Sequence, residues 1–65
     1  MEYYEDIAER FEQLGELHDA LAALLALSSN PKHGETDHAL GEAEQTTADT
    51  CRRVAASIRS RLRVP

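Results

Sequence analysis

Residues 4–25 read YEDIAERFEQLGELHDALAALL, and this stretch decides the fold. Its apolar positions recur at intervals of three and four residues, the heptad pattern of a helix that packs along one side. Glutamates crowd its first turns, where negative charge complements the helix dipole. The pattern predicts a helix over residues 3–27. Its heptad positions are Tyr4, Ile7, Phe11, Leu14, His18, Leu21 and Leu25.

A break and a second helical pattern follow. Pro31 disfavours helix at the residue before it, and Gly34 is a second breaker, so residues 28–34 are predicted to form a loop. With Thr36 as the expected N-cap, the remaining sequence predicts a helix over residues 35–63. Its heptad positions are Leu40, Thr47, Cys51, Val54 and Ile58.

Two helices of nearly equal length joined by a short loop form an antiparallel hairpin, so residues 1–65 are predicted to be a single all-α domain. A chain of 65 residues buries too little surface for a secure core of its own. Its one cysteine excludes an internal disulfide, and no Cys/His cluster has zinc spacing. Small domains without these supports usually oligomerise. We therefore expect the hairpin to assemble into a homo-oligomeric helical bundle, a dimer or higher. The expected oligomer core comprises Ile7, Phe11, Leu14, His18, Leu21, Leu25, Leu40, Cys51, Val54 and Ile58.

Charge is distributed unevenly along the chain. The net charge is −5, yet residues 31–65 hold six bases and five acids, whereas residues 1–30 hold seven acids and one base. A hairpin brings the acidic start beside the arginine-rich end. The longest apolar run, residues 20–27, is too short to span a membrane. A lone cysteine and the lack of a signal peptide indicate a cytoplasmic location.

Few features of the sequence indicate metal binding or catalysis. His38 and Glu42 lie four residues apart on one helical face, but two ligands are a common surface pattern, so no metal is expected. No glycine-rich phosphate loop is present, and two helices offer no rigid pocket for a catalytic set. We therefore expect a binding protein with no enzymatic activity and no cofactor.

Aromatic residues are confined to the start of the chain, opposite the arginines in a hairpin. Aromatic rings beside guanidinium groups suit a ligand that carries a base and a phosphate. Tyr3, Tyr4, Arg59 and Arg63 are therefore the candidate ligand contacts, and Thr47 adds a hydroxyl along the second helix. An alternative interpretation pairs the arginines with the acidic N-terminus alone.

The first helix carries Tyr-Glu-x-Ile at residues 4–7, and the second carries Glu35, Ala39, Leu40 and Glu44. In these features the chain resembles the helical-hairpin phage proteins that sequester cyclic nucleotide signals of bacterial immunity, the sponges of the anti-CBASS and anti-Thoeris type. The resemblance implies an anti-defence role, in which oligomers of hairpins hold the ligand between protomers.

Two other classes of function stay open. The first is a protein-interaction module, such as a phage inhibitor or an antitoxin-like subunit, which binds a basic partner. Its expected surface is acidic and comprises Glu5, Glu9, Glu12 and Glu16. The second is an RNA-binding regulator that forms a four-helix bundle, since length, acidity and architecture are similar to those of a plasmid copy-number regulator. Overall acidity argues against broad DNA binding.

Overall fold

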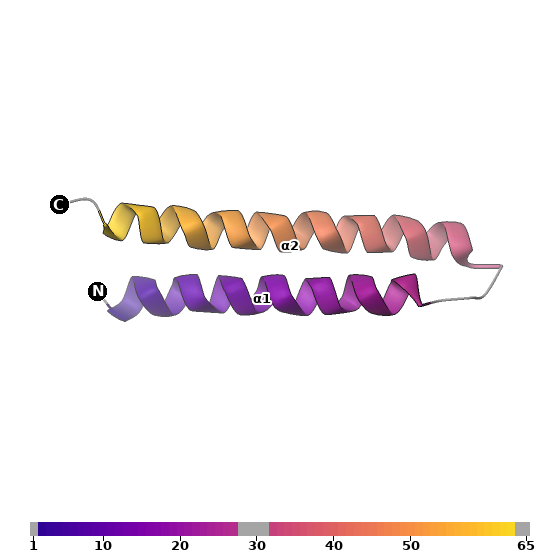
Figure 1. Ribbon diagram of the computed structural model, residues 1–65, viewed down its shortest axis with the longest axis horizontal. Helices are drawn as coiled ribbons and strands as arrows, with labels where there is room; N and C mark the ends of the chain where they lie inside the picture. The colour runs from indigo at the N-terminus through magenta and orange to yellow at the C-terminus, as the bar shows by residue number, and fades with distance from the viewer. Residues whose placement is uncertain (1, 28–31, 64–65) are drawn as a thin grey trace.

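The structure is a computed structural model that describes residues 2–27 and 32–63. Helix α1 spans Glu2–Ala26 and helix α2 spans Gly34–Leu62. The two helices run side by side in opposite directions, with both termini at one end and the connection at the other (Figure 1). The described residues contain no strand. The prediction of an all-α helical hairpin is confirmed, and the molecule is a rod with extents of 54 × 14 × 11 Å.

The start of α2 differs from the prediction. The helix begins at Gly34, its N-cap is His33, and the backbone N–H of Asp37 donates to the His33 carbonyl at 2.8 Å. Thr36 therefore lies inside the first turn, and its prediction as the N-cap was wrong. Glycine costs little in a first turn, where the N–H groups have no partner within the helix. Residues 28–31 of the predicted loop, Pro31 included, lie outside the described residues.

The two helices meet along a seam of small residues. This small-residue seam comprises every buried residue of the described chain, namely Ala8, Gly15 and Ala22 on α1 and Ala48, Cys51 and Ala55 on α2. The α1 members recur every seven residues, as expected for a helix that keeps one line against its partner. Within residues 2–27 and 32–63, no large side chain is fully buried. The hairpin therefore closes by bringing its backbones together and not by filling a bulky core.

Gly15 lies where the two helices approach each other closely. A Cβ atom placed on Gly15 would lie 3.3 Å from the carbonyl oxygen of Ala48 and 3.3 Å from Cγ of Arg52. That separation is tighter than most real Cβ contacts. Glycine at this position lets α1 and α2 pack at a distance that a larger residue would increase.

The seam shifts the phase of the predicted heptads. Phe11, His18 and Leu25 are half-buried beside the small residues, whereas Leu14, Leu21 and Leu40 are exposed in the single hairpin. Cys51 is buried as a free thiol in the seam. Ile7, Val54 and Ile58 are half-buried. The role of these residues in an oligomer core stays a prediction.

Candidate functional site

One flank of the hairpin is closed by ion pairs between the helices. Arg59 binds Glu12 and lies 3.7 Å from a carboxylate oxygen of Glu5, and Arg52 binds Asp19. The hydrogen bond to Glu12 is the main cause that raises the pKa of Arg59 above its ordinary value. We call these five residues the polar flank. The expected match between the acidic start and the basic end is therefore confirmed for Arg52 and Arg59.

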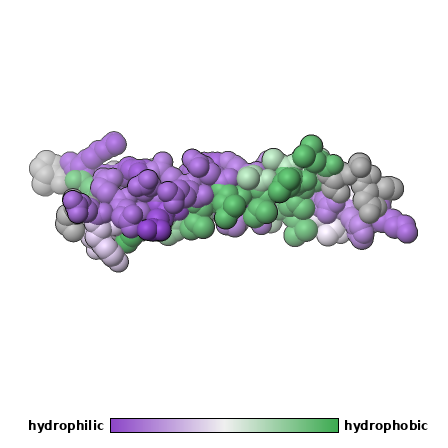
Figure 2. Space-filling view, turned by 90° about the horizontal axis from the view of Figure 1, so that it is seen from below, coloured by the Kyte–Doolittle hydropathy of each residue, from purple (hydrophilic) through white to green (hydrophobic). Residues whose placement is uncertain are grey.

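The opposite side of α1 carries the bulky apolar side chains. Leu14, Leu17, Leu21 and Leu24 are spaced three, four and three residues apart, so they share one stripe, which we call the leucine face. Leu17 is 56% exposed and Leu24 is 64% exposed. The view onto α1 shows an apolar band that runs from the middle of the rod toward the connection, whereas the end with the termini is mainly hydrophilic (Figure 2).

Helix α2 extends this apolar surface. Leu40, Thr47 and Val54 recur every seven residues on the side of α2 away from the polar flank. The hydroxyl of Thr47 donates to the Ala43 carbonyl at 2.9 Å, so the methyl group is the part that the helix presents. Thr46 and Thr50 make the same type of bond to carbonyls of their own helix. In these three threonines the hydroxyl hydrogen is already used within α2, so they add apolar surface and offer no free hydroxyl donor.

The hairpin exposes more surface than a globular chain of its size. Its accessible surface is 5181 Å² for a mass of 7.2 kDa. A folded monomer of this mass is expected to expose about 4,100 Å². The excess, roughly 1,000 Å², is about what one partner contributes to a protein–protein interface of standard size. Exposed leucines account for part of it, since five of the eight exposed large hydrophobic residues in the described part of the chain lie from Leu14 to Leu27.

The predicted ligand residues fall into three groups. Tyr3 and Tyr4 lie edge to face, with ring centroids 5.1 Å apart. Tyr4 lines a shallow hollow of about 270 Å³, which we call the terminal corner. Its other lining residues are Ile58, Arg61 and Leu62.

The other predicted contacts lie elsewhere. Arg59 and Arg63 line a separate hollow with Glu12 of α1 and Arg52, Ala55 and Ala56 of α2. Thr47 lies twelve residues before Arg59 on the same helix, or about 18 Å along its axis. The structure therefore places Arg61, which was not among the predicted ligand contacts, in the same hollow as Tyr4. Its spacing of three from Ile58 was the available signal, because residues three apart share a helix face.

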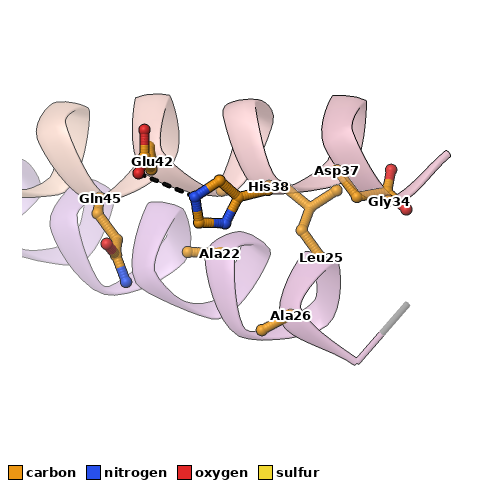
Figure 3. A pocket seen from close by; sticks show the side chains of 9 residues that line it. Ala22, Leu25, Ala26, Gly34, Asp37, His38, Glu42 and Gln45 are labelled. Atoms are coloured by element: carbon orange, nitrogen blue, oxygen red, sulfur yellow. Dashed lines mark ion pairs between the residues drawn. The ribbon is translucent and has the colours of Figure 1, made fainter. Parts of the chain in front are cut away.

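A hollow of about 300 Å³ lies near the connection, between the end of α1 and the start of α2. Ala22, Leu25 and Ala26 line it from α1, and His38, Glu42 and Gln45 lie across from them (Figure 3). His38 Nε2 and a Glu42 carboxylate oxygen are 3.0 Å apart, but both side chains are mostly exposed. Among the described residues, no group of three His, Cys, Asp or Glu side chains could hold a metal ion.

His18 links the helices near the small-residue seam. Its Nδ1 donates to a carboxylate oxygen of Glu44, and both side chains are roughly three-quarters buried. The pair is a specific polar contact in an otherwise apolar stretch. Such contacts fix the register of packed helices, since a shift of either helix would leave both groups without their partner.

No protein-family model, curated protein or solved structure matches this chain. Within residues 2–27 and 32–63, neither helix combines the length and the apolar character that a membrane crossing requires. The candidate site is therefore described from its own geometry, in which the leucine face is an exposed apolar stripe outside the small-residue seam.

Proposed function

We propose that this chain is a non-enzymatic protein-interaction module that binds through the leucine face. The observation that carries the proposal is the position of the leucines, which lie outside the hairpin seam and in one stripe. Burial of exposed apolar surface is the main favourable term in association, at about 25 cal/mol per Å². An apolar stripe with heptad spacing fits the surface of another helix.

The distribution of charge on the hairpin also favours the leucine face as the binding surface. Glu5, Glu12 and Asp19 face α2 on the polar flank, where two arginines bind them. Arg10 continues the stripe one turn before Leu14, and it is already paired with Asp6 at 3.0 Å. The stretch from Leu14 to Leu24 on this stripe therefore presents no unpaired charge to a partner. Interface centres are typically depleted of charge in this way.

The test compares two lysine substitutions on α1. A tagged chain is used to retain proteins from cells that also express an untagged copy. Leu17→Lys introduces a charge in the middle of the leucine face, and Ala23→Lys introduces the same charge on another side of the helix. Wild type and Ala23→Lys should retain the same protein, either the untagged copy or a second protein, and Leu17→Lys should lose it. The proposal would be contradicted if wild type, Ala23→Lys and Leu17→Lys retained the same protein equally, or if none of them retained a protein.

A second candidate is the sequestration of a phosphate-bearing ligand, with a cyclic nucleotide as the ligand class. The terminal corner favours it, because Tyr4 and Arg61 line the same hollow. Among the described residues, no carboxylate forms an ion pair with Arg61. The hollow is slightly smaller than typical ligand pockets, which start at about 300 Å³, so a second protomer would have to complete it.

Calorimetric titration with a cyclic dinucleotide tests this second candidate. Arg61→Ala should remove binding, whereas Arg53→Ala, which changes an arginine outside the terminal corner, should preserve it. Circular dichroism must show equal helicity in both variants. Binding that survives Arg61→Ala, or that wild type does not show, would exclude this candidate.

A further inference from the structure

We infer that the partner on the leucine face is a second copy of this chain, arranged antiparallel to the first so that two hairpins form a four-helix bundle. This inference rests on the proposed function and specifies its partner. Three observations carry it: the amount of excess surface, the distribution of charge between the two ends of the rod, and the position of the leucines relative to its middle.

The excess surface matches a dimer of the same chain. Each hairpin exposes roughly 1,000 Å² more than expected, and a standard interface buries about 800 Å² on each partner. One isologous contact on one flank therefore removes the excess from both copies. The apolar surface spans both helices, from the leucine face to Leu40 and Val54. A helix pair meeting a helix pair covers that width, whereas a single helix would leave part of it exposed.

The charges select the orientation. The hairpin is divided at its middle by the contact between Gly15 and Ala48. Residues 2–14 and 50–63 form the half with the termini and carry six bases and five acids, or +1. Residues 15–27 and 32–49 form the other half and carry one base and seven acids, or −6. A parallel dimer would place −6 beside −6. An antiparallel dimer places each −6 half beside a +1 half, so the like-charge repulsion is avoided.

The leucine positions set the register. Leu14 and Leu17 lie on either side of Gly15, and therefore on either side of the middle of the rod. Antiparallel helices that overlap fully pair these two positions with each other. In this register Leu14 contacts Leu17 of the partner subunit, and Ile7 contacts Leu24 of the partner subunit. The two-fold axis passes through the level of Gly15, perpendicular to the helices.

Sedimentation equilibrium of the purified chain tests the dimer. Wild type should have twice the mass of 7.2 kDa. Leu17→Lys should raise the dissociation constant of the dimer at least about tenfold, because it places a charge at the centre of an apolar interface. Ala23→Lys should leave the dissociation constant within about twofold of wild type. A monomeric wild type, or a Leu17→Lys protein that dimerises as wild type does, would overturn the inference.

Engineered disulfides test the orientation and do not require a disruptive variant. Ile7→Cys and Leu24→Cys are made separately in a Cys51→Ser background and oxidised in a glutathione buffer. The antiparallel register predicts a cross-linked dimer when the two variants are mixed and almost none from either variant alone. Cross-linking of each variant with itself would indicate a parallel dimer and overturn the orientation. Ala23→Cys mixed with Ile7→Cys is the control and should remain monomeric on a non-reducing gel.

The outcomes separate this inference from the proposed function. A chain that is monomeric when pure, yet retains another protein from cells in a manner that depends on Leu17, would refute the dimer and leave the leucine face as a binding surface. A pure chain that dimerises equally with and without the Leu17→Lys change would refute the dimer on this face, and retention from cells that does not depend on Leu17 would refute the proposed function.

Discussion

Gly15 of α1 lies directly against Ala48 of α2, and the backbone oxygen of Ala48 occupies the space next to the position that a Cβ of Gly15 would take. The carbonyl is held within a rigid helix, so it cannot move away alone, whereas the nearby Arg52 side chain can. The two helices must therefore separate if residue 15 becomes larger. This relationship makes the small-residue seam testable at a single position.

Gly15→Leu should lower the free energy of unfolding by about 2–3 kcal/mol, because overpacking forces the helices apart. Gly15→Ala should change it by less than about 1 kcal/mol, since the better helix propensity of alanine offsets the crowding. Gly41→Ala is the matched control: its Cβ would lie 3.9 Å from Leu25 Cβ, an ordinary contact. It should stabilise the protein by up to about 1 kcal/mol. Urea unfolding at one fixed protein concentration measures all three, and a neutral Gly15→Leu would argue against the close seam.

The hydrogen bond between His18 and Glu44 should couple the two residues energetically. In a double-mutant cycle with His18→Ala and Glu44→Ala, we expect a coupling free energy of about 1 kcal/mol, reduced from the buried value by partial exposure. The cycle of His38→Ala and Glu42→Ala provides the comparison, because that pair is exposed and lies within one helix. Its coupling should be at most about 0.5 kcal/mol. Equal coupling free energies in the two cycles would contradict a role of His18 in setting the register of the helices.

Arg59→Gln should lower the thermal midpoint, since Arg59 connects α2 to both Glu5 and Glu12. The raised pKa of Arg59 means that its favourable contribution is present below the ordinary arginine pKa and is lost only as the pH rises past the folded value. Salt is therefore the useful variable near neutral pH. Added salt should destabilise wild type more than Arg59→Gln. Arg53→Gln is the control, because no carboxylate pairs with Arg53 in the described chain, and it should show the wild-type salt dependence.

Thr47→Val should leave the unfolding free energy within about 0.5 kcal/mol, because the hydroxyl is used within its own helix and the methyl group is kept. Sedimentation should show association at least as strong as in wild type. Thr47→Asp should weaken association by placing a charge on the apolar side of α2. A loss of cyclic dinucleotide binding in Thr47→Val would contradict this account and restore Thr47 as a ligand contact.

The sequence was sufficient for the hairpin but not for the phase of its seam. The heptad interpretation gave weight to bulky residues such as Leu14 and Leu21, as if the largest side chains had to lie between the helices. The actual seam follows Ala8, Gly15 and Ala22, which recur just as regularly. Alanine and glycine are much less hydrophobic than leucine. A heptad of small residues is therefore hard to recognise in a sequence where a heptad of leucines runs beside it.

The candidate site shows the same limit. Charge patterning predicted that the acidic start meets the arginines, and the partners of Arg52 and Arg59 confirm it. It did not reveal which arginine would lie beside Tyr4, because that depends on the rotation of α2 about its axis. The rotation is set by the small residues of the seam. Once the seam is known, the separation of Arg59 from Arg61 follows from helical geometry.

The small-residue seam also determines when the chain gains its stability. Alanine and glycine have no side-chain rotamers to lose, so closing the hairpin costs little side-chain entropy, but it also releases little apolar surface from water. The larger transfer free energy resides in the leucines and becomes available only when a partner covers them. With a second copy as that partner, as inferred above, persistence of the fold is governed by mass action. The fraction of chains open to proteolysis should then fall as the concentration of the protein rises.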